Sequence, residues 1–113
     1  MESLPAYTQK IRTDLSGFDL KRNSGKIEQL LKLSKSVSEI EEEFDCEIAK
    51  TNLSPAFNQA AIEVLFHGEI EANKKRITLL QSTMDLADGM NISVNPIDEE
   101  VQITFFVENI WEK

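Results

Sequence analysis

Residues 54–88 read SPAFNQAAIEVLFHGEIEANKKRITLLQSTMDLAD, and we interpret them as one long central helix. Ser54 followed by Pro55 is typical of a helix start, because a hydroxyl group caps the first turn and proline there loses no hydrogen bond. Apolar side chains then recur at helical spacing: Ile62, Phe66, Ile70, Ile77, Leu80 and Met84. The sequence therefore predicts a helix over about 55–88, around which the rest of the chain packs.

One position weakens this interpretation. Gly68 follows His67 in the middle of the stretch, and glycine inside a helix costs about 1 kcal/mol relative to alanine. A kink or break at His67-Gly68 therefore stays open as an alternative. The apolar stripe continues on both sides of this position, which favours an unbroken helix.

Two further helices are predicted before the central one. The first spans about 4–16, where Ser3 lies ahead of Pro5 and Gly17 supplies a stop. The second spans about 26–48 and repeats apolar residues in steps of three and four: Leu30, Leu33, Val37, Ile40 and Phe44. We expect the second helix to pack antiparallel against the central helix, because the connection over 50–53 is short.

After Gly89 the spacing of apolar residues changes to two, which predicts a β-hairpin with strands over about 91–95 and 100–108. The predicted fold is therefore a single α+β domain over 1–113, predominantly α, with three helices: the long central helix packs against the other two, and a C-terminal β-hairpin covers one end or face. The predicted core consists of Ile11, Leu15, Leu30, Leu33, Val37, Ile40, Phe44, Leu65, Phe66, Ile70, Ile77, Leu80, Ile103 and Phe105.

The charge of the chain is strongly negative and unevenly placed. The net charge is −8; residues 1–35 hold seven basic and four acidic side chains, whereas residues 36–113 hold five and sixteen. Such a surface repels nucleic acid and anionic membranes and attracts basic proteins, although solubility alone also explains it. The chain has no apolar run of about 20 residues, no signal-peptide pattern and a single cysteine, so we expect a cytoplasmic protein.

Few residues in the chain suit catalysis. Cys46 lies between Asp45 and Glu47, whose charges disfavour the thiolate that a nucleophile needs, and His67 is the only histidine. A zinc site needs several Cys or His ligands, and the chain has no glycine-rich phosphate loop. We therefore expect no enzyme activity, no cofactor and no metal; a small hydrolase is kept only as a formal alternative.

Acidic residues gather where the second helix is expected to end: Glu39, Glu42, Glu43, Asp45 and Glu47. Carboxylates near a helix C-terminus oppose the helix dipole and repel one another, and no cation lies nearby in the sequence. Such an unfavourable cluster is typical of a docking face for a basic partner. An ordinary solvated helix face is the alternative.

A second candidate surface is the last predicted strand. Over 101–107 it carries no proline or lysine to protect its edge, and Phe106 points away from the face that holds Phe105. We expect Phe106 or Trp111 to contact another chain. In the alternative, the first helix or the tail over 109–111 folds over and covers both.

These observations predict a non-enzymatic, acidic protein-binding module that masks or holds a basic partner protein, in the manner of an inhibitor, an immunity protein or a chaperone. At the level of architecture only, the predicted fold is similar to small bacterial secretion chaperones and toxin-neutralising immunity proteins. The partner-binding residues would be Glu39, Glu42, Glu43, Asp45, Glu47, Phe106 and Trp111. The competing hypothesis is a self-assembling structural subunit, at least a homodimer, that oligomerises through its helical seams and a sheet edge.

Overall fold

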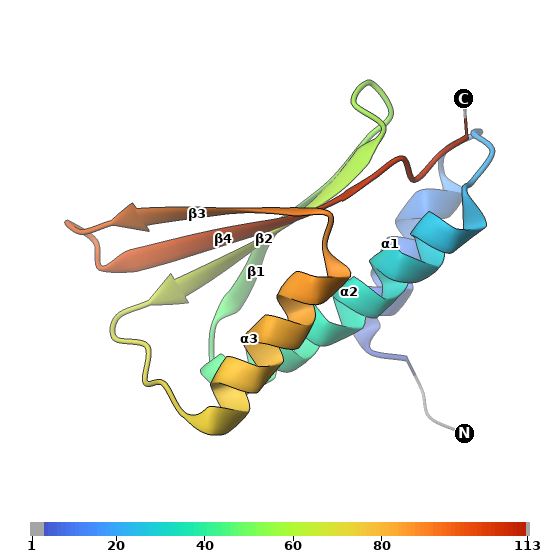
Figure 1. The fold of residues 1–113 in the computed structure, drawn as a ribbon. Helices are drawn as coiled ribbons and strands as arrows, with labels where there is room; N and C mark the ends of the chain where they lie inside the picture. The colour runs from blue at the N-terminus through green and yellow to red at the C-terminus, as the bar shows by residue number, and fades with distance from the viewer. Residues whose placement is uncertain (1–3, 113) are drawn as a thin grey trace.

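The computed structural model describes residues 4–112 and shows three helices on one face of a four-stranded antiparallel sheet (Figure 1). The helices are α1 (Ala6–Ser16), α2 (Ser24–Phe44) and α3 (Lys74–Leu86). The strands are β1 (Glu47–Ser54), β2 (Gln59–His67), β3 (Gly89–Asn95) and β4 (Glu100–Glu108), in the order β1-β2-β4-β3. The predicted α+β class is confirmed, but the sheet is larger than a C-terminal hairpin.

The predicted central helix over 55–88 is wrong in its first half. Residues 59–67 form β2, in which Ala60, Ile62, Val64 and Phe66 are buried and the residues between them are not. Ser54 is the last residue of β1, and Pro55 begins the turn between β1 and β2, in which the Asn58 N–H donates to the Pro55 carbonyl at 3.2 Å. Ile62 and Phe66 are four residues apart, a spacing that fits a strand as well as a helix, and this ambiguity produced the error.

The second half of that stretch is helical but shorter than predicted. Gly68 adopts a positive φ of 70° and ends β2, so the chain does break at His67-Gly68. Helix α3 begins only after Asn73, whose side-chain oxygen caps the helix by accepting from the Arg76 N–H at 2.9 Å. Ile70 therefore lies in a loop; it and Ile77 are exposed rather than part of the core.

Helix α2 also ends earlier than the predicted 48. Asp45 takes the left-handed conformation with φ of 51°, which stops the helix after Phe44. The chain then enters β1 instead of a helix–helix loop, so the predicted helical hairpin is replaced by the β1–β2 hairpin. Helix α3 nevertheless packs against α2, as was expected of the central helix.

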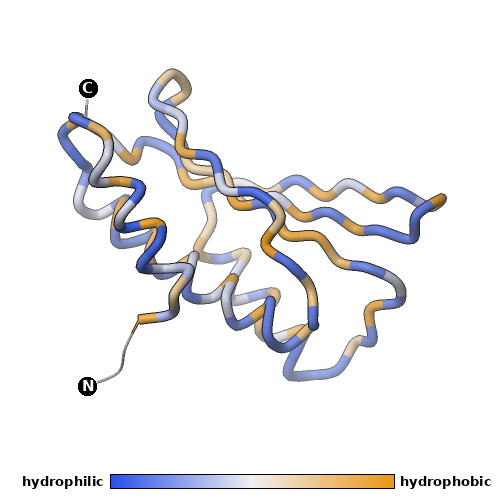
Figure 2. The backbone as a smooth tube through the Cα atoms, turned by 180° about the vertical axis from the view of Figure 1, so that it is seen from behind, coloured by the Kyte–Doolittle hydropathy of each residue, from blue (hydrophilic) through white to orange (hydrophobic). Residues whose placement is uncertain are grey.

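The core lies between the helices and the sheet face that they cover. Along the strands, hydrophobic and hydrophilic residues alternate (Figure 2), and the hydrophobic ones on the covered face meet α1 and α2. Of the predicted core residues, nine are buried: Ile11, Leu15, Leu30, Leu33, Val37, Ile40, Phe66, Ile103 and Phe105. Phe44 and Leu80 are half-buried against this core, whereas Leu65 lies on the other face of β2.

The C-terminal hairpin is present close to its predicted bounds, but its place in the sheet was not predicted. Strand β4 pairs with β2 on one side and with β3 on the other, so it has no free edge. The prediction of an unprotected edge at 101–107 is therefore wrong, and the edges of the sheet are β1 and β3.

Candidate functional site

The acidic residues predicted at the end of α2 lie beside α3. Glu39, Glu42 and Glu43 line a hollow of about 450 Å³ between the two helices, which we call the α2–α3 hollow; its other lining residues are Lys75, Thr78, Leu79 and Ser82. Glu39 and Glu42 are exposed. The structure therefore brings part of the predicted acidic cluster together on a concave surface.

Glu43 is neutralised by cations that are distant in the sequence, although none lies nearby along the chain. Lys75 Nζ lies 3.0 Å from one carboxylate oxygen and Arg76 Nε lies 3.7 Å from the other. The Arg76 guanidinium also donates to the Glu43 carbonyl at 3.0 Å and lies 5.0 Å from the centre of the Phe44 ring. Both cations come from α3, some 30 residues later in the sequence. Glu43 thus has a structural role in joining α2 to α3.

The remaining members of the cluster flank Cys46. Asp45 and Glu47 are exposed, at the end of α2 and the start of β1. Burial raises the pKa of the Cys46 thiol to about 11, and the neighbouring carboxylates add to this effect. The thiol therefore stays protonated near neutral pH, as expected for a packing residue.

The two aromatic residues predicted to contact a partner differ in exposure. Trp111 is only 4% exposed, and its ring lies 5.1 Å from that of Phe18, centre to centre. The tail thus folds onto the domain, as the alternative to a partner contact required, and almost none of Trp111 is available to another chain. Phe106 is half-buried on the sheet face opposite the helices.

A further surface lies on the half of the sheet that the helices leave uncovered. The β3–β4 hairpin projects beyond the helices in both views of the backbone (Figures 1 and 2). Ile92 and Val94 lie on the helix side of β3, opposite Ile103 and Val101 of β4, yet they are 58% and 63% exposed. Ile97, in the turn of this hairpin, is 91% exposed. We call Ile92, Val94, Ile97 and Val101 the open sheet end.

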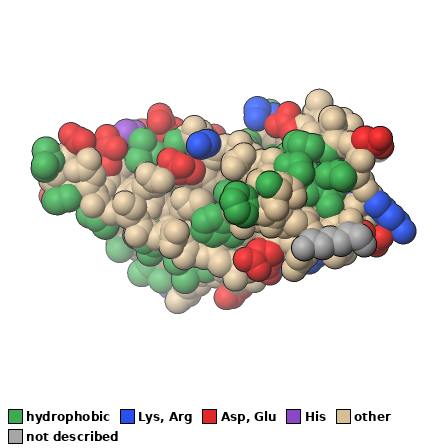
Figure 3. All heavy atoms as spheres, turned by 90° about the horizontal axis from the view of Figure 1, so that it is seen from above, with side chains coloured by type: hydrophobic (Ala, Val, Ile, Leu, Met, Phe, Trp, Pro, Cys, Tyr) green, Lys and Arg blue, Asp and Glu red, His purple; other side chains and the backbone are tan. Residues whose placement is uncertain are grey.

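Carboxylates lie beside the open sheet end at the hairpin tip. A hollow of about 250 Å³ is lined by Gly68, Glu69, Val94, Asn95, Pro96, Glu99, Glu100 and Val101. Its apolar part is Val94 and Val101, and none of its lining residues within the described chain is Lys or Arg. Figure 3 shows hydrophobic side chains at the tip of the hairpin with acidic side chains beside them. This arrangement offers apolar contact and negative charge together.

Sequence reasoning missed the open sheet end because alternation of apolar residues indicates which face a side chain is on, not whether that face is covered. One signal was present in the sequence. Ile97 follows Pro96 in an otherwise polar turn, where a large apolar side chain has nothing to pack against.

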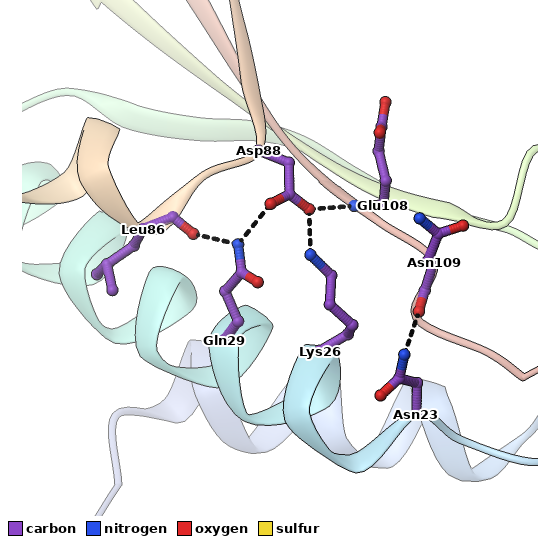
Figure 4. A network of polar contacts seen from close by, with 7 residues as sticks. All are labelled: Asn23, Lys26, Gln29, Leu86, Asp88, Glu108 and Asn109. Atoms are coloured by element: carbon purple, nitrogen blue, oxygen red, sulfur yellow. Dashed lines mark hydrogen bonds and ion pairs between the residues drawn. The ribbon is translucent and has the colours of Figure 1, made fainter.

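Asp88, in contrast, serves the fold. Its carboxylate accepts from Lys26 Nζ at 2.6 Å, from Gln29 Nε2 at 3.0 Å and from the Glu108 N–H at 2.8 Å (Figure 4). Burial alone would raise the pKa of Asp88, but these donors hold it below its usual value. The network joins the start of α2 to β3 and β4.

Residues 4–112 contain neither a cluster of metal ligands nor a helix that could span a membrane. That part of the chain holds no group of three or more Cys, His, Asp or Glu residues placed to bind a metal ion. None of its helices has the length and apolar content needed to cross a membrane. Compared with protein-family models, curated proteins and solved structures, the chain matches none.

Proposed function

We propose that this protein is a non-enzymatic binding module that holds or masks a basic partner protein at the open sheet end. The observation that carries the proposal is the apolar face of β3 and β4, which no helix of the described residues covers and which has Glu69, Glu99 and Glu100 near it at the hairpin tip. Single exposed apolar residues are ordinary, but Ile92, Val94 and Ile97 lie together at one end of the molecule. A contiguous apolar surface with charged surroundings is typical of a protein interface.

The charge of the chain defines the kind of partner. The net charge is −8, and the hollow at the open sheet end holds Glu69, Glu99 and Glu100. A partner with Lys or Arg around an apolar centre would be attracted over a distance and would then bury apolar area on contact. The exposed Glu39 and Glu42 of the α2–α3 hollow add to this attraction.

The experiment is affinity capture from the source cells with wild-type protein and two variants, with captured proteins quantified by mass spectrometry. Ile92→Ser combined with Val94→Ser removes the apolar surface, and Phe57→Ser is the matched control because Phe57 is an exposed aromatic in the β1–β2 turn. We expect a basic protein to be captured by wild type and by Phe57→Ser, and to be lost with the double variant or at high salt. A capture pattern that is the same for all three proteins and insensitive to salt would contradict the proposal.

Charge reversal separates the acidic face from the open sheet end. Glu39→Lys with Glu42→Lys should slow association at low salt without changing the fold, because both side chains are exposed. Glu43 is left unchanged because it binds Lys75 and Arg76. An unchanged association rate would assign Glu39 and Glu42 to an ordinary solvated face.

Light scattering tests the competing hypothesis of a self-assembling subunit. A stable oligomer of the purified protein that becomes monomeric in the Ile92→Ser, Val94→Ser variant would favour self-assembly through the same surface. A monomer over a wide concentration range favours the binding module.

A further inference from the structure

We infer that the partner binds as an extended, cationic segment that adds a fifth strand to the sheet along β3. This inference rests on the proposed function and specifies how the open sheet end would be used. It follows from the direction of the backbone groups of β3, from the difference between the two edges of the sheet, and from the charges near the hairpin tip.

The direction of the backbone groups follows from the pairing of β2 with β4. The Gly68 N–H donates to the Glu99 carbonyl at 2.9 Å, and the Asn109 N–H donates to the Asn58 carbonyl at 2.7 Å. Both pairs continue the β2–β4 register, in which hydrogen-bonded pairs alternate with pairs that are not bonded. The odd-numbered residues over 101–107 therefore direct their N–H and C=O groups toward β2.

The even-numbered residues of β4 then direct their backbone groups toward β3. Gln102 lies opposite Ser93 and Thr104 lies opposite Asn91, so Ser93 and Asn91 are the residues of β3 that bond to β4. The residues between them direct their N–H and C=O groups to the outer edge: Met90, Ile92 and Val94. No other strand pairs with this edge in the described chain.

The two edges of the sheet differ in protection. The register of β1 shifts between Ile48 and Lys50, and β1 also carries the charged Glu47 and Lys50. Bulges and charged side chains are the usual means by which proteins prevent strand addition. Strand β3, with the sequence GMNISVN, has a continuous register, no charge and no proline. Of the two edges, only β3 suits an added strand.

The side chains around β3 define the chemistry of the added segment. Every second residue of an added strand would lie on the helix side, next to Ile92 and Val94, where apolar side chains bury the most area. Near the hairpin tip the edge of β3 meets the hollow that holds Glu69 and Glu99, which suit Lys or Arg, while the Glu100 side chain belongs to the opposite face of the sheet. The segment would thus alternate apolar residues with others and carry cations at the end that reaches the tip.

Charge favours such a segment over a second copy of this chain. Two copies paired through β3 would each bring a net charge of −8 to the interface. Each copy would also bring the carboxylates of its own hairpin-tip hollow, among whose lining residues in the described chain there is no Lys or Arg. A cationic extended segment would hydrogen-bond to the edge of β3, cover its apolar face and pair with the carboxylates near the hairpin tip.

The test uses a synthetic peptide of alternating valine and lysine, titrated into isotope-labelled protein. We expect the exchange of the Ile92 and Val94 amide protons with solvent to slow on binding, because they become hydrogen-bonded. An alternating valine–glutamate peptide should not bind. A valine–lysine peptide methylated at its backbone nitrogens keeps the charge but cannot pair as a strand, so it should also leave these amides unprotected.

Two variants of one residue separate strand pairing from apolar contact. Ile92→Pro removes an outward N–H that β4 does not use, so the fold should persist, as circular dichroism would verify. Ile92→Pro should lower the affinity for the valine–lysine peptide by about tenfold or more, as expected for a lost hydrogen bond. Ile92→Thr keeps the N–H and should lower that affinity less. The methylated peptide gives an independent answer with wild-type protein if Ile92→Pro does not fold.

The outcomes distinguish this inference from the proposed function. One outcome would support the proposed function but refute strand addition. In it, the Ile92→Ser, Val94→Ser variant no longer captures the basic partner, yet the peptide does not slow exchange of the β3 amides and methylating the peptide does not change its affinity. The partner would then dock on the apolar face of β3 and β4 without pairing as a strand. If Ile92 and Val94 are protected in the protein alone and lose that protection on dilution, a second copy occupies the edge and the inference is overturned. Slowed exchange with the valine–lysine peptide alone supports it.

Discussion

Asn58 fastens the C-terminal tail to the β1–β2 turn, and we expect Asn58→Ala to lower the free energy of unfolding by about 3 kcal/mol. The residue is 7% exposed. Its Nδ2 donates to the Trp111 carbonyl and its Oδ1 accepts from the Trp111 N–H, both at 2.9 Å. Its backbone takes the left-handed conformation with φ of 51°.

The magnitude has two parts. Each lost hydrogen bond costs about 1 kcal/mol, and the Trp111 backbone groups are left buried without a partner. Alanine at a positive φ costs about 1 kcal/mol more, because its Cβ approaches the following carbonyl, whereas asparagine and glycine tolerate this conformation. Asn58→Gly removes only the hydrogen bonds, so it should destabilise the fold by about 2 kcal/mol.

Urea unfolding measures both variants, followed by circular dichroism and by the fluorescence of Trp111, the only tryptophan of the chain. We expect the two signals to change together and the order of stability to be wild type, Asn58→Gly, Asn58→Ala. If both variants stay within about 0.5 kcal/mol of wild type, the hydrogen bonds to Trp111 contribute nothing and the reasoning is wrong. A fluorescence change at lower urea than the circular dichroism change would mean that the tail detaches alone.

Three further predictions concern other parts of the fold. Because its donors hold the pKa of Asp88 below the usual value, Asp88 stabilises the fold above about pH 4 and loses that effect as the pH falls through its folded pKa. Urea unfolding should therefore show Asp88→Asn to be less stable than wild type at pH 7 and nearly equal to it in strong acid. Asp85→Asn, at an exposed position, is the control and should match wild type at pH 7. With its pKa raised to about 11, Cys46 should react with iodoacetamide at pH 8 about a hundredfold more slowly in the native protein than in urea; similar rates would contradict the burial of the thiol. Phe105→Ala leaves a cavity in the core and should lower the free energy of unfolding in urea by about 3–5 kcal/mol. Ile97→Ser, at an exposed position, should change it by less than about 0.5 kcal/mol, and a large effect would mean that Ile97 packs within the chain.

Local sequence was sufficient to predict a helix or a strand where the apolar residues fitted only one spacing. Steps of three and four from Leu30 to Phe44 identified α2, because no strand places those side chains on one face. Alternation over 101–107 identified β4 for the corresponding reason. Of the nine predicted core residues that are buried, six followed from these two patterns.

Local sequence failed where two patterns overlapped. Ile62 and Phe66 fit both a helix and a strand, and Val64 between them was the residue that marked the strand. The choice depended on residues 33 to 49 positions later in the chain, because β4 supplies backbone partners that make 59–67 a central strand. Pairing between segments so far apart cannot be predicted from the residues that are adjacent in the sequence.

The candidate binding surface depended on tertiary structure almost entirely. The sequence by itself determined that the chain is acidic, that Glu39 and Glu42 lie on a helix, and that Ile92 and Val94 share one face of a strand. Only the tertiary structure decided that α3 cations neutralise Glu43, that Trp111 is buried by Phe18, and that the apolar face of β3 is left open. The physical reason is that burial and ion pairing depend on what lies opposite a side chain, whereas a sequence pattern specifies only the direction in which that side chain points.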